Sequence, residues 1–241
     1  VQPGAEFFES TLSAQASQMR ALAAAESAED LFLRLERDGV MLRIDRNVVP
    51  DMYHCAIISE GEVALLQRIE TIVRLGHVRK LTPAGMEMTG GVVPMHPETL
   101  YIDCTASAVT RHPQVPIFRD NAITLQITRA CQPTFSAALI GAIEALSLTD
   151  EEKNNLCQPL PLPDTPKDFF AVSLTNMMNQ YVWARTPNIR DWLMRSRLDG
   201  FTRRLSEVTE NDVETHAILN TFRRNTPDAI ANIQRLMMQP A

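Results

Sequence analysis

A strand-like run of residues ends in four small or polar residues that could touch a ligand. The run is residues 100–102, and the turn after it is Asp103, Cys104, Thr105 and Ala106. β-Branched and aromatic residues favour a buried strand here, and ligands gather at the carboxyl ends of strands in open α/β sheets. The turn is therefore a candidate cofactor edge. An ordinary strand end, in which Asp103 closes the turn, explains the same residues.

A second polar group comes just before a strongly apolar stretch. The polar residues are Gln126, Arg129, Gln132 and Ser136, and the apolar residues 137–146 predict a buried helix. The first turn of such a helix leaves backbone N–H groups free to face an anion or a carbonyl group. Alternatively, the four residues only cap a core helix.

The cysteines and histidines are too scattered to predict a metal site. None of the four cysteines forms a C-x-x-C pair, and no two histidines have an i, i+4 spacing. We therefore expect no metal, and reduced thiols as the default. Cys104 and Cys131 could approach each other as a redox pair, although unpaired cysteines more often pack as small hydrophobic residues. His54 and Cys55 are adjacent, and on a strand they would point to opposite faces, which argues against a dyad.

The composition is that of an ordinary globular protein. Hydrophobic residues make up 45% and charged residues 22% of the 241 residues, which argues against general disorder. The net charge of -6 argues against a basic nucleic-acid-binding surface, and no apolar run approaches the ~20 residues that span a bilayer. We therefore expect a cytoplasmic protein with no nucleic-acid or membrane partner. The sequence contains neither G-x-G-x-x-G nor G-x-x-x-x-G-K-S/T, so it carries no phosphate-binding loop of its own.

Helical and strand-like periods alternate in the first 158 residues. This alternation predicts an α/β fold. Helices are expected over residues 5–25, 27–39, 59–70 and 136–146, with a short one after the capping box that begins at Thr149. Strands are expected over residues 40–45, 53–58, 72–81, 86–93, 100–102 and 123–127, with a β-meander over residues 71–104 and a loop over 107–122.

A proline-rich segment divides the chain. Residues 159–163 read Pro-Leu-Pro-Leu-Pro, which favours an extended, polyproline-like backbone. We place a boundary there, between residues 1–158 and 159–241. Beyond it the pattern predicts only helices, over residues 164–184, 187–197, 209–224 and 226–238. Asp164 and Thr226 fit as caps, and Pro187 and Pro227 suit first helical positions.

Four runs of sequence, taken in order, resemble a known class of protein. They are Leu-Glu-Arg-Asp-Gly-Val-Met-Leu-Arg-Ile-Asp at 35–45, Val-Arg-Leu-Gly-His-Val-Arg-Lys-Leu at 73–81, Leu-Tyr-Ile-Asp-Cys-Thr-Ala at 100–106 and Cys-Gln-Pro-Thr-Phe-Ser-Ala-Ala-Leu-Ile at 131–140. Together they resemble the carboxyl-terminal part of bacterial FAD/NAD(P)-binding Rossmann oxidoreductases, related to flavin monooxygenases and pyridine-nucleotide oxidoreductases. The resemblance covers roughly residues 1–165, and the helical remainder is similar to the tail of that branch.

This resemblance implies a partial Rossmann-like region over residues 1–158 and a helical region over 159–241. It implies FAD and NAD(P) as cofactors and a small-molecule substrate. It also implies that an amino-terminal half with the glycine-rich FAD loop is missing from this sequence or belongs to a partner chain. By position alone, the cofactor-binding candidates are Asp103, Cys104, Thr105, Ala106, Gln126, Arg129, Gln132 and Ser136. The resemblance names no catalytic residue, and Cys-Thr-Ala departs from the Ala-Thr-Gly that is frequent at that strand end.

Two functions fit this pattern. The first is a portion of a flavin-dependent oxidoreductase that takes hydride from a pyridine nucleotide. Such a portion is not expected to be catalytic alone, because the phosphate-binding loops are absent. The second is a non-catalytic α/β plus helical module that binds a protein partner. An exposed apolar face would accompany either function.

Overall fold

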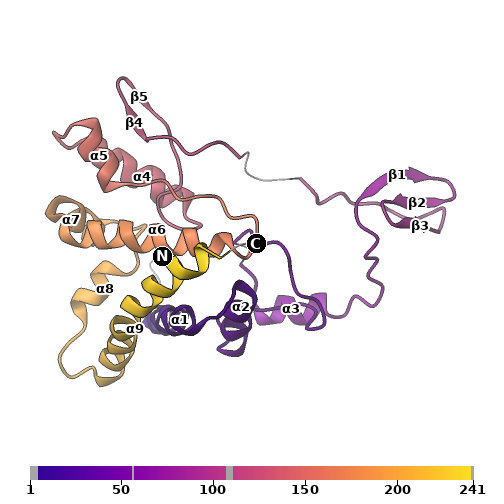
Figure 1. Cartoon of the computed structure of the whole chain (residues 1–241), viewed down its shortest axis with the longest axis horizontal. Helices are drawn as coiled ribbons and strands as arrows, with labels where there is room; N and C mark the ends of the chain where they lie inside the picture. Colours follow the sequence, from indigo (N-terminus) through magenta and orange to yellow (C-terminus); the bar gives the residue numbers. More distant parts are fainter. Residues whose placement is uncertain (1–4, 56, 107–110, 240–241) are drawn as a thin grey trace. The chain divides into compact units, whose positions relative to one another are not determined.

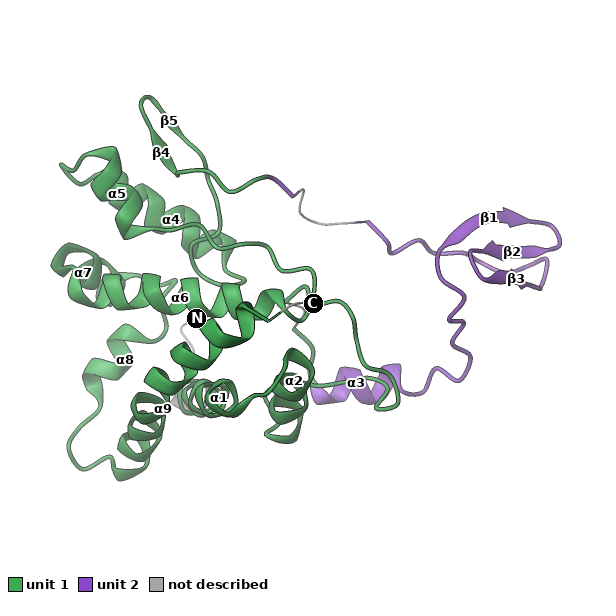
Figure 2. Ribbon diagram, in the orientation of Figure 1, with its two compact units in different colours: residues 1–59, 113–241 green, residues 60–112 purple. Residues whose placement is uncertain are grey.

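The structure is a computed structural model that describes residues 5–55, 57–106 and 111–239. It divides into two compact units. Unit 1 comprises residues 1–59 and 113–241, and unit 2 comprises residues 60–112 (Figures 1 and 2). The fold is mixed α/β, with small antiparallel sheets and a helical carboxyl-terminal region, and at this level it confirms the predicted class.

Unit 1 is mainly helical. Its helices are α1 (Ala5–Ala24), α2 (Ala28–Arg37), α4 (Pro133–Glu144), α5 (Asp150–Leu156), α6 (Asp168–Arg185), α7 (Pro187–Arg195), α8 (Thr202–Glu207) and α9 (Val213–Met237). A short antiparallel hairpin of β4 (Phe118–Arg119) and β5 (Ala122–Ile123) precedes α4. The sequence pattern does not predict α8.

Two hydrophobic clusters form the core of unit 1. The first packs α1, α2, α6 and α9 around residues such as Leu22, Phe170 and Ile233, and α1 and α9 lie side by side (Figure 1). The second packs the β4–β5 hairpin, α4, α6 and α7 around Phe135 and Trp183. Because α6 contributes to both clusters, it joins the two halves of the unit.

Local sequence explains where several helices begin and end. Ser27 caps α2 by accepting a hydrogen bond from the Asp30 N–H at 3.1 Å, and Gly39 follows the helix with φ at +70°. Thr149 and Glu152 form the predicted capping box at the start of α5. These caps confirm the helix boundaries that were predicted from neighbouring residues.

Asp164 does not cap α6 as predicted. The helix begins at Asp168, and its N-cap residue is Lys167. The Asp168 carboxylate accepts hydrogen bonds from the N–H groups of Asp164 and Thr165, at 2.9 and 2.8 Å. The carboxylate that stabilises this helix start is therefore one turn later than predicted.

The last two predicted helices form one continuous helix. α9 contains Pro227 in its interior, whereas the sequence predicts a break just before this proline. Thr226 is not an N-cap, because its hydroxyl donates a hydrogen bond to the Phe222 carbonyl oxygen at 2.8 Å within the helix. Ile233, beyond the proline, is fully buried in the first cluster. Packing of α9 therefore outweighs the local preference for a helix end.

Unit 2 contains helix α3 (Glu60–Leu66) and a three-stranded antiparallel sheet. The strands are β1 (Val78–Thr82), β2 (Gly85–Met88) and β3 (Gly91–Val93), in the order β1-β2-β3. The sheet confirms a meander in this region, although the first strand starts at residue 78 and not at 72, and the predicted strand over 86–93 is two paired strands, β2 and β3. Gly85 is required at the β1–β2 turn because its φ is +143° and a Cβ atom there would collide with the Val93 carbonyl oxygen.

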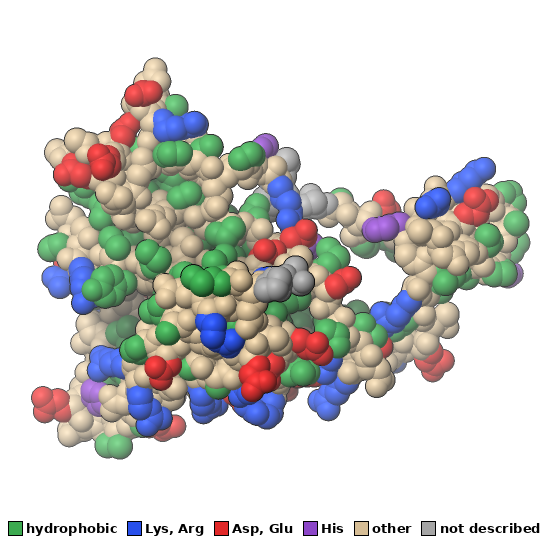
Figure 3. Space-filling view, viewed as in Figure 1, with side chains coloured by type: hydrophobic (Ala, Val, Ile, Leu, Met, Phe, Trp, Pro, Cys, Tyr) green, Lys and Arg blue, Asp and Glu red, His purple; other side chains and the backbone are tan. Residues whose placement is uncertain are grey.

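The sheet of unit 2 leaves apolar side chains in solvent. Val78, Leu81 and Val92 are all exposed. Figure 3 shows hydrophobic side chains at the surface of this unit, beside lysine and arginine side chains. A sheet of three short strands is too small to bury both of its faces.

Several predicted strands are wrong for the described part of the chain. Among the described residues, no strand partner exists for residues 100–102, 40–45 or 53–58, and within 123–127 only Ile123 pairs, with Phe118. Residue 56 of the predicted strand 53–58 lies outside the described residues, and so do residues 107–110 of the predicted loop 107–122. Leu100 and Ile102, which were expected to be buried, are 82% and 76% exposed. β-Propensity produces a strand only where a neighbouring strand supplies hydrogen bonds, and the described residues supply none there.

Residues 40–45 extend the end of α2 instead of forming a strand. The N–H groups of Val40 and Met41 both donate to the Leu35 carbonyl oxygen, at 2.8 and 3.2 Å. Arg43 then forms an ion pair with Glu36 at 2.8 Å. These contacts turn the chain back onto the helix, and Leu42 and Ile44, which the alternating pattern places on an inward face, are exposed.

The predicted boundary between residues 158 and 159 falls inside unit 1. The Leu160 N–H donates to the Ile127 carbonyl oxygen at 2.7 Å, and the Asn179 side chain bonds both backbone groups of Gln158. In the structure, the chain divides around the insertion of residues 60–112. The boundary, which marks a change in composition, stays a prediction. None of the helices in the described ranges combines the length and the apolar character that a membrane crossing needs.

Candidate functional site

Ser136 lies in a buried hydrogen-bond network at the start of α4. Its hydroxyl accepts hydrogen bonds from the N–H groups of Thr128 and Arg129, at 3.0 and 3.3 Å, and donates to the Gln132 carbonyl oxygen at 2.8 Å. The residue is only 1% exposed. Because the single donor and both lone pairs are in use, this hydroxyl holds the loop before α4 and is not available to a ligand.

Two asparagines of α6 hold the same loop from the other side. The Asn179 amide donates to the carbonyl oxygens of Thr128 and Gln158, at 2.8 and 2.7 Å. Asn176 accepts a hydrogen bond from the Ala130 N–H at 3.0 Å. Neither residue stands out in the sequence. The signal that could have found them is their i, i+3 spacing, which places both on one side of the helix.

Arg129 is committed to an internal ion pair. Its guanidinium lies 3.5 Å from the Asp199 carboxylate, which is almost fully buried, and 4.5 Å from the centre of the Phe135 ring. Burial lowers the pKa of Arg129, and the Asp199 charge opposes that shift. The arginine therefore neutralises a buried carboxylate, and Asp199 is a partner that the sequence analysis missed.

Gln126 is also occupied, whereas Gln132 is open. The Gln126 amide bonds both backbone groups of Val115, accepting from its N–H at 3.2 Å and donating to its carbonyl at 2.6 Å. Gln132 is the N-cap residue of α4, is exposed, and makes no side-chain capping hydrogen bond. The candidate site in unit 1 therefore reduces to Gln132 and the free N–H groups of the first turn of α4.

The turn after residues 100–102 satisfies its own aspartate. The Asp103 carboxylate accepts hydrogen bonds from the N–H and the hydroxyl of Thr105, at 2.9 and 2.7 Å. These two bonds hold the pKa of Asp103 below its usual range. Cys104 is a free, exposed thiol, and Ala106 is also exposed. The turn belongs to unit 2, whereas Gln132 belongs to unit 1.

A disulfide joins Cys55 to Cys131, with a Cα–Cα distance of 6.2 Å. The expectation of reduced thiols is therefore wrong for these two residues, and so is the pairing of Cys104 with Cys131. Cys157 is free and buried, and burial raises the pKa of its thiol to about 12. The two bonded cysteines are 76 residues apart in the sequence, so a pattern of neighbouring residues does not predict the bond.

His54, next to the disulfide, pairs with Asp164. Its Nε2 atom lies 2.8 Å from a carboxylate oxygen of Asp164 at the surface. The Tyr53 N–H also donates to the Asp164 carbonyl oxygen, at 2.8 Å. The segment is not a strand, so the opposite-face argument does not apply to it. The recorded side-chain partner of His54 is a carboxylate, whereas Cys55 is in the disulfide, so the two residues do not form a Cys/His dyad.

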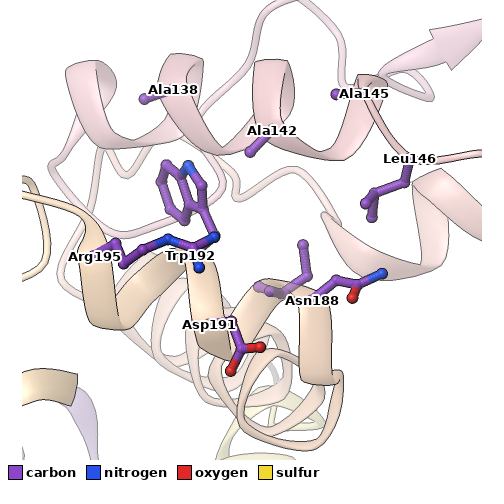
Figure 4. Close-up of a pocket in the computed structure, with 9 residues that line it drawn as sticks. Ala138, Ala142, Ala145, Leu146, Asn188, Asp191, Trp192 and Arg195 are labelled. Carbon is purple, nitrogen blue, oxygen red and sulfur yellow. The ribbon is translucent and has the colours of Figure 1, made fainter.

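A hollow of about 490 Å³ lies between α4 and α7. Figure 4 shows Trp192 of α7 pointing toward Ala138 and Ala142 of α4, with Asp191 and Arg195 beside it. The hollow is open to solvent and its lining polar groups are exposed, so it has the character of a groove between helices. Within the residues that the structure describes, no three His, Cys, Asp or Glu side chains are grouped as they would be around a metal ion.

Comparison with known proteins gives relatives but no family. No protein-family model and no solved structure matches the chain. Three curated mycobacterial proteins are each 36% identical over 237 residues: uncharacterized protein Mb2023 of Mycobacterium bovis, and uncharacterized proteins MT2056 and Rv2000 of Mycobacterium tuberculosis. The match covers 98% of this chain but 44% of each relative. The chain thus spans less than half the length of the curated relatives it matches.

Proposed function

We propose that the chain is a portion of a flavin-dependent oxidoreductase that takes hydride from a pyridine nucleotide, and that residues outside this sequence complete its Rossmann-like sheet. The observation that carries the proposal is the run of residues 100–102. Its Leu100 and Ile102 side chains are 82% and 76% exposed, and its backbone has no strand partner among the described residues. An apolar, strand-forming run is stable in water only when another strand pairs with it.

Two further segments support the same interpretation. Ile57 is 95% exposed and Leu125 is 66% exposed, and both lie in segments whose sequence predicts strands. Burying each such side chain is worth about 1.5–3 kcal/mol, so their exposure is a substantial cost to an isolated chain. Strands of parallel sheets are apolar on both faces because helices cover both faces. More than half of each relative lies outside the matched span, which leaves enough chain for such a sheet.

The start of α4 is the part of unit 1 that fits a cofactor. Gln132 has an open amide, and the first turn of α4 offers backbone N–H groups at the positive end of the helix. Such a site suits a carbonyl group or an anion, as found on flavin rings and nucleotide phosphates. Ser136 fixes the loop that carries Gln132. FAD and NAD(P) would supply the hydride chemistry, while these residues would bind and orient.

The test joins this chain to the portion of a longer relative that lies outside the matched span. The joined protein is mixed with FAD and desalted, and its visible spectrum is recorded. We expect the flavin absorption to stay with the joined protein after desalting. In a separate assay, the chain alone should not oxidise NAD(P)H. In the joined protein, Gln132→Ala should weaken FAD binding about tenfold, the value of one hydrogen bond. Gln234→Ala removes another exposed amide, on α9, and should have no effect.

The competing function is a non-catalytic module that binds a protein partner. The exposed apolar residues favour it as well, because a partner could cover them. The spectrum separates the two functions. A joined protein that is folded and monodisperse but colourless would contradict the oxidoreductase proposal and favour the module.

A further inference from the structure

We propose that the Cys55–Cys131 disulfide is a thiol–disulfide exchange site that accepts two electrons from an external dithiol and, on opening, releases the segment that leads into unit 2. The disulfide is a covalent bond of unit 1, and its exchange requires neither flavin nor pyridine nucleotide. The proposal is therefore independent of the function proposed above.

The disulfide closes a loop around the whole of unit 2. Cys55 lies four residues before the end of the first part of unit 1, and Cys131 lies shortly after the chain returns to it. The 76-residue separation therefore contains all of residues 60–112. The bond joins the chain segment that enters the insertion to the segment that leaves it.

The departing segment is held to unit 1 without the disulfide. The Gln126 amide bonds both backbone groups of Val115, and the Asn154 amide bonds both backbone groups of Phe118. The Gln114 side chain adds a hydrogen bond to the Pro159 carbonyl oxygen at 2.7 Å. Opening the disulfide should therefore leave residues 113–131 in place.

The entering segment depends on the disulfide. Tyr53 and His54 are anchored to Asp164, but for the described residues 55, 57 and 58 the structure records no hydrogen bond. Ile57 is 95% exposed, so packing does not hold it either. Reduction of the disulfide should therefore free Cys55 and the described residues 57 and 58.

The surroundings of Cys131 favour exchange. Cys131 is exposed whereas Cys55 is half-buried, so an incoming thiolate reaches the Cys131 sulfur first. Cys131 directly precedes Gln132, the N-cap of α4, and the positive end of a helix stabilises a thiolate. Both cysteines also have left-handed backbones, with φ at +57° and +58°, which residues other than glycine rarely adopt. Opening the bond lets Cys55 leave that conformation.

The exchange balances with a dithiol as the reductant. A thiolate of the dithiol attacks the Cys131 sulfur, a mixed disulfide forms, and Cys55 leaves as a thiolate that takes up a proton. The second thiol of the reductant then attacks its own sulfur in the mixed disulfide and releases Cys131 as a thiolate, which is protonated in turn. The dithiol is oxidised to a disulfide, and the protein gains two electrons and two protons.

The first experiment titrates the full, natively folded chain with dithiothreitol and labels thiols with N-ethylmaleimide, which mass spectrometry locates. Cys104 is exposed and should label without reductant, whereas buried Cys157 should stay unlabelled and report that the fold is intact. We expect Cys55 and Cys131 to label under conditions that leave Cys157 protected. Labelling of the pair only together with Cys157, on unfolding, would show a structural disulfide and overturn the proposal.

Hydrogen exchange on the same samples tests the release. Reduction should speed amide exchange in residues 55, 57 and 58 at least tenfold. Residues 114–126, which keep their hydrogen bonds, should exchange at an unchanged rate. Equal protection of residues 55, 57 and 58 in the oxidised and reduced chains would refute the release.

Two variants in a Cys104→Ser background identify the exchanging sulfur. Cys55→Ser leaves Cys131 as a free thiol, and Cys131→Ser leaves Cys55. We expect Cys131 to form a mixed disulfide with oxidised glutathione at least tenfold faster than Cys55 does. The reverse order would overturn the assignment of Cys131 as the attacked sulfur. The wild-type titration needs neither variant, so the proposal can be tested even if a variant does not fold.

Discussion

At the scale of single residues, the Ser136 hydroxyl makes three hydrogen bonds, and its removal should destabilise unit 1. Ser136→Ala leaves the buried N–H groups of Thr128 and Arg129 without an acceptor. We expect the free energy of unfolding to fall by about 2–3 kcal/mol, because each unsatisfied buried donor costs about 1–3 kcal/mol. Urea denaturation followed by circular dichroism measures the change.

Ser173→Ala is the matched control for that change. Ser173 is similarly buried, at 6% exposure, but its hydroxyl makes no recorded hydrogen bond. Its replacement should change the stability by less than about 0.5 kcal/mol. Equal losses in the two variants would mean that the Ser136 network does not carry the stability of this loop.

The sequence identified the residues around the start of α4 but not what they do. Gln126, Arg129 and Ser136 stand out because they precede an apolar helix, and that signal is local. Their partners are distant in sequence, as with Asn179, which bonds Thr128 across 51 residues. A pattern of neighbours cannot show such a bond, so structural roles and cofactor-binding roles looked alike before the structure was known.

At the scale of elements, Pro227 should weaken α9. It lies inside the helix, where proline lacks the N–H that would bond one turn back and crowds the preceding turn. Since Pro227 is exposed, Pro227→Ala restores that bond without disturbing the core. We expect the stability to rise by about 2 kcal/mol, somewhat less than the full preference of a helix interior for alanine, because proline also restricts the unfolded chain.

Pro187→Ala is the control for the helix position. Pro187 is also exposed, but it is the first residue of α7, where proline has no N–H to lose. Thermal unfolding followed by circular dichroism compares the two variants, and Pro187→Ala should show unchanged or slightly lower stability. If Pro227→Ala lowered the stability instead, the helix would depend on a bend at the proline.

Helix boundaries were predictable where the cap lies beside the helix, and strands were not. Ser27 and Thr149 cap α2 and α5 with groups three residues away. A strand needs a partner that can lie anywhere in the sequence or outside it, so residues 100–102 carry the propensity without the pairing. The predicted break of α9 before Pro227 was wrong for a related reason. Burial of Ile233, a contact distant in sequence, outweighs the local preference of Pro227 for a helix start.

At the scale of the whole molecule, the buried core of unit 1 is made of residues of unit 1. Both hydrophobic clusters consist of residues of unit 1, from Met19 to Leu236 in the first and from Ile117 to Leu193 in the second. The disulfide belongs to unit 1 as well. Within the described chain, the core of unit 1 therefore takes no buried residue from the insertion.

A chain in which a flexible linker of about 20 residues replaces residues 60–112 should therefore still fold. Loop-closure entropy changes slowly with loop length, so the free energy of unfolding should stay within about 1 kcal/mol of that of the full chain. Thermal unfolding by circular dichroism measures this, and labelling before and after reduction shows whether Cys55 and Cys131 still pair. Trp183→Ala in the same chain should lower the stability by about 3–5 kcal/mol, which shows that the melt reports on the second cluster. Loss of a cooperative transition in the shortened chain would mean that unit 1 needs residues 60–112 to fold.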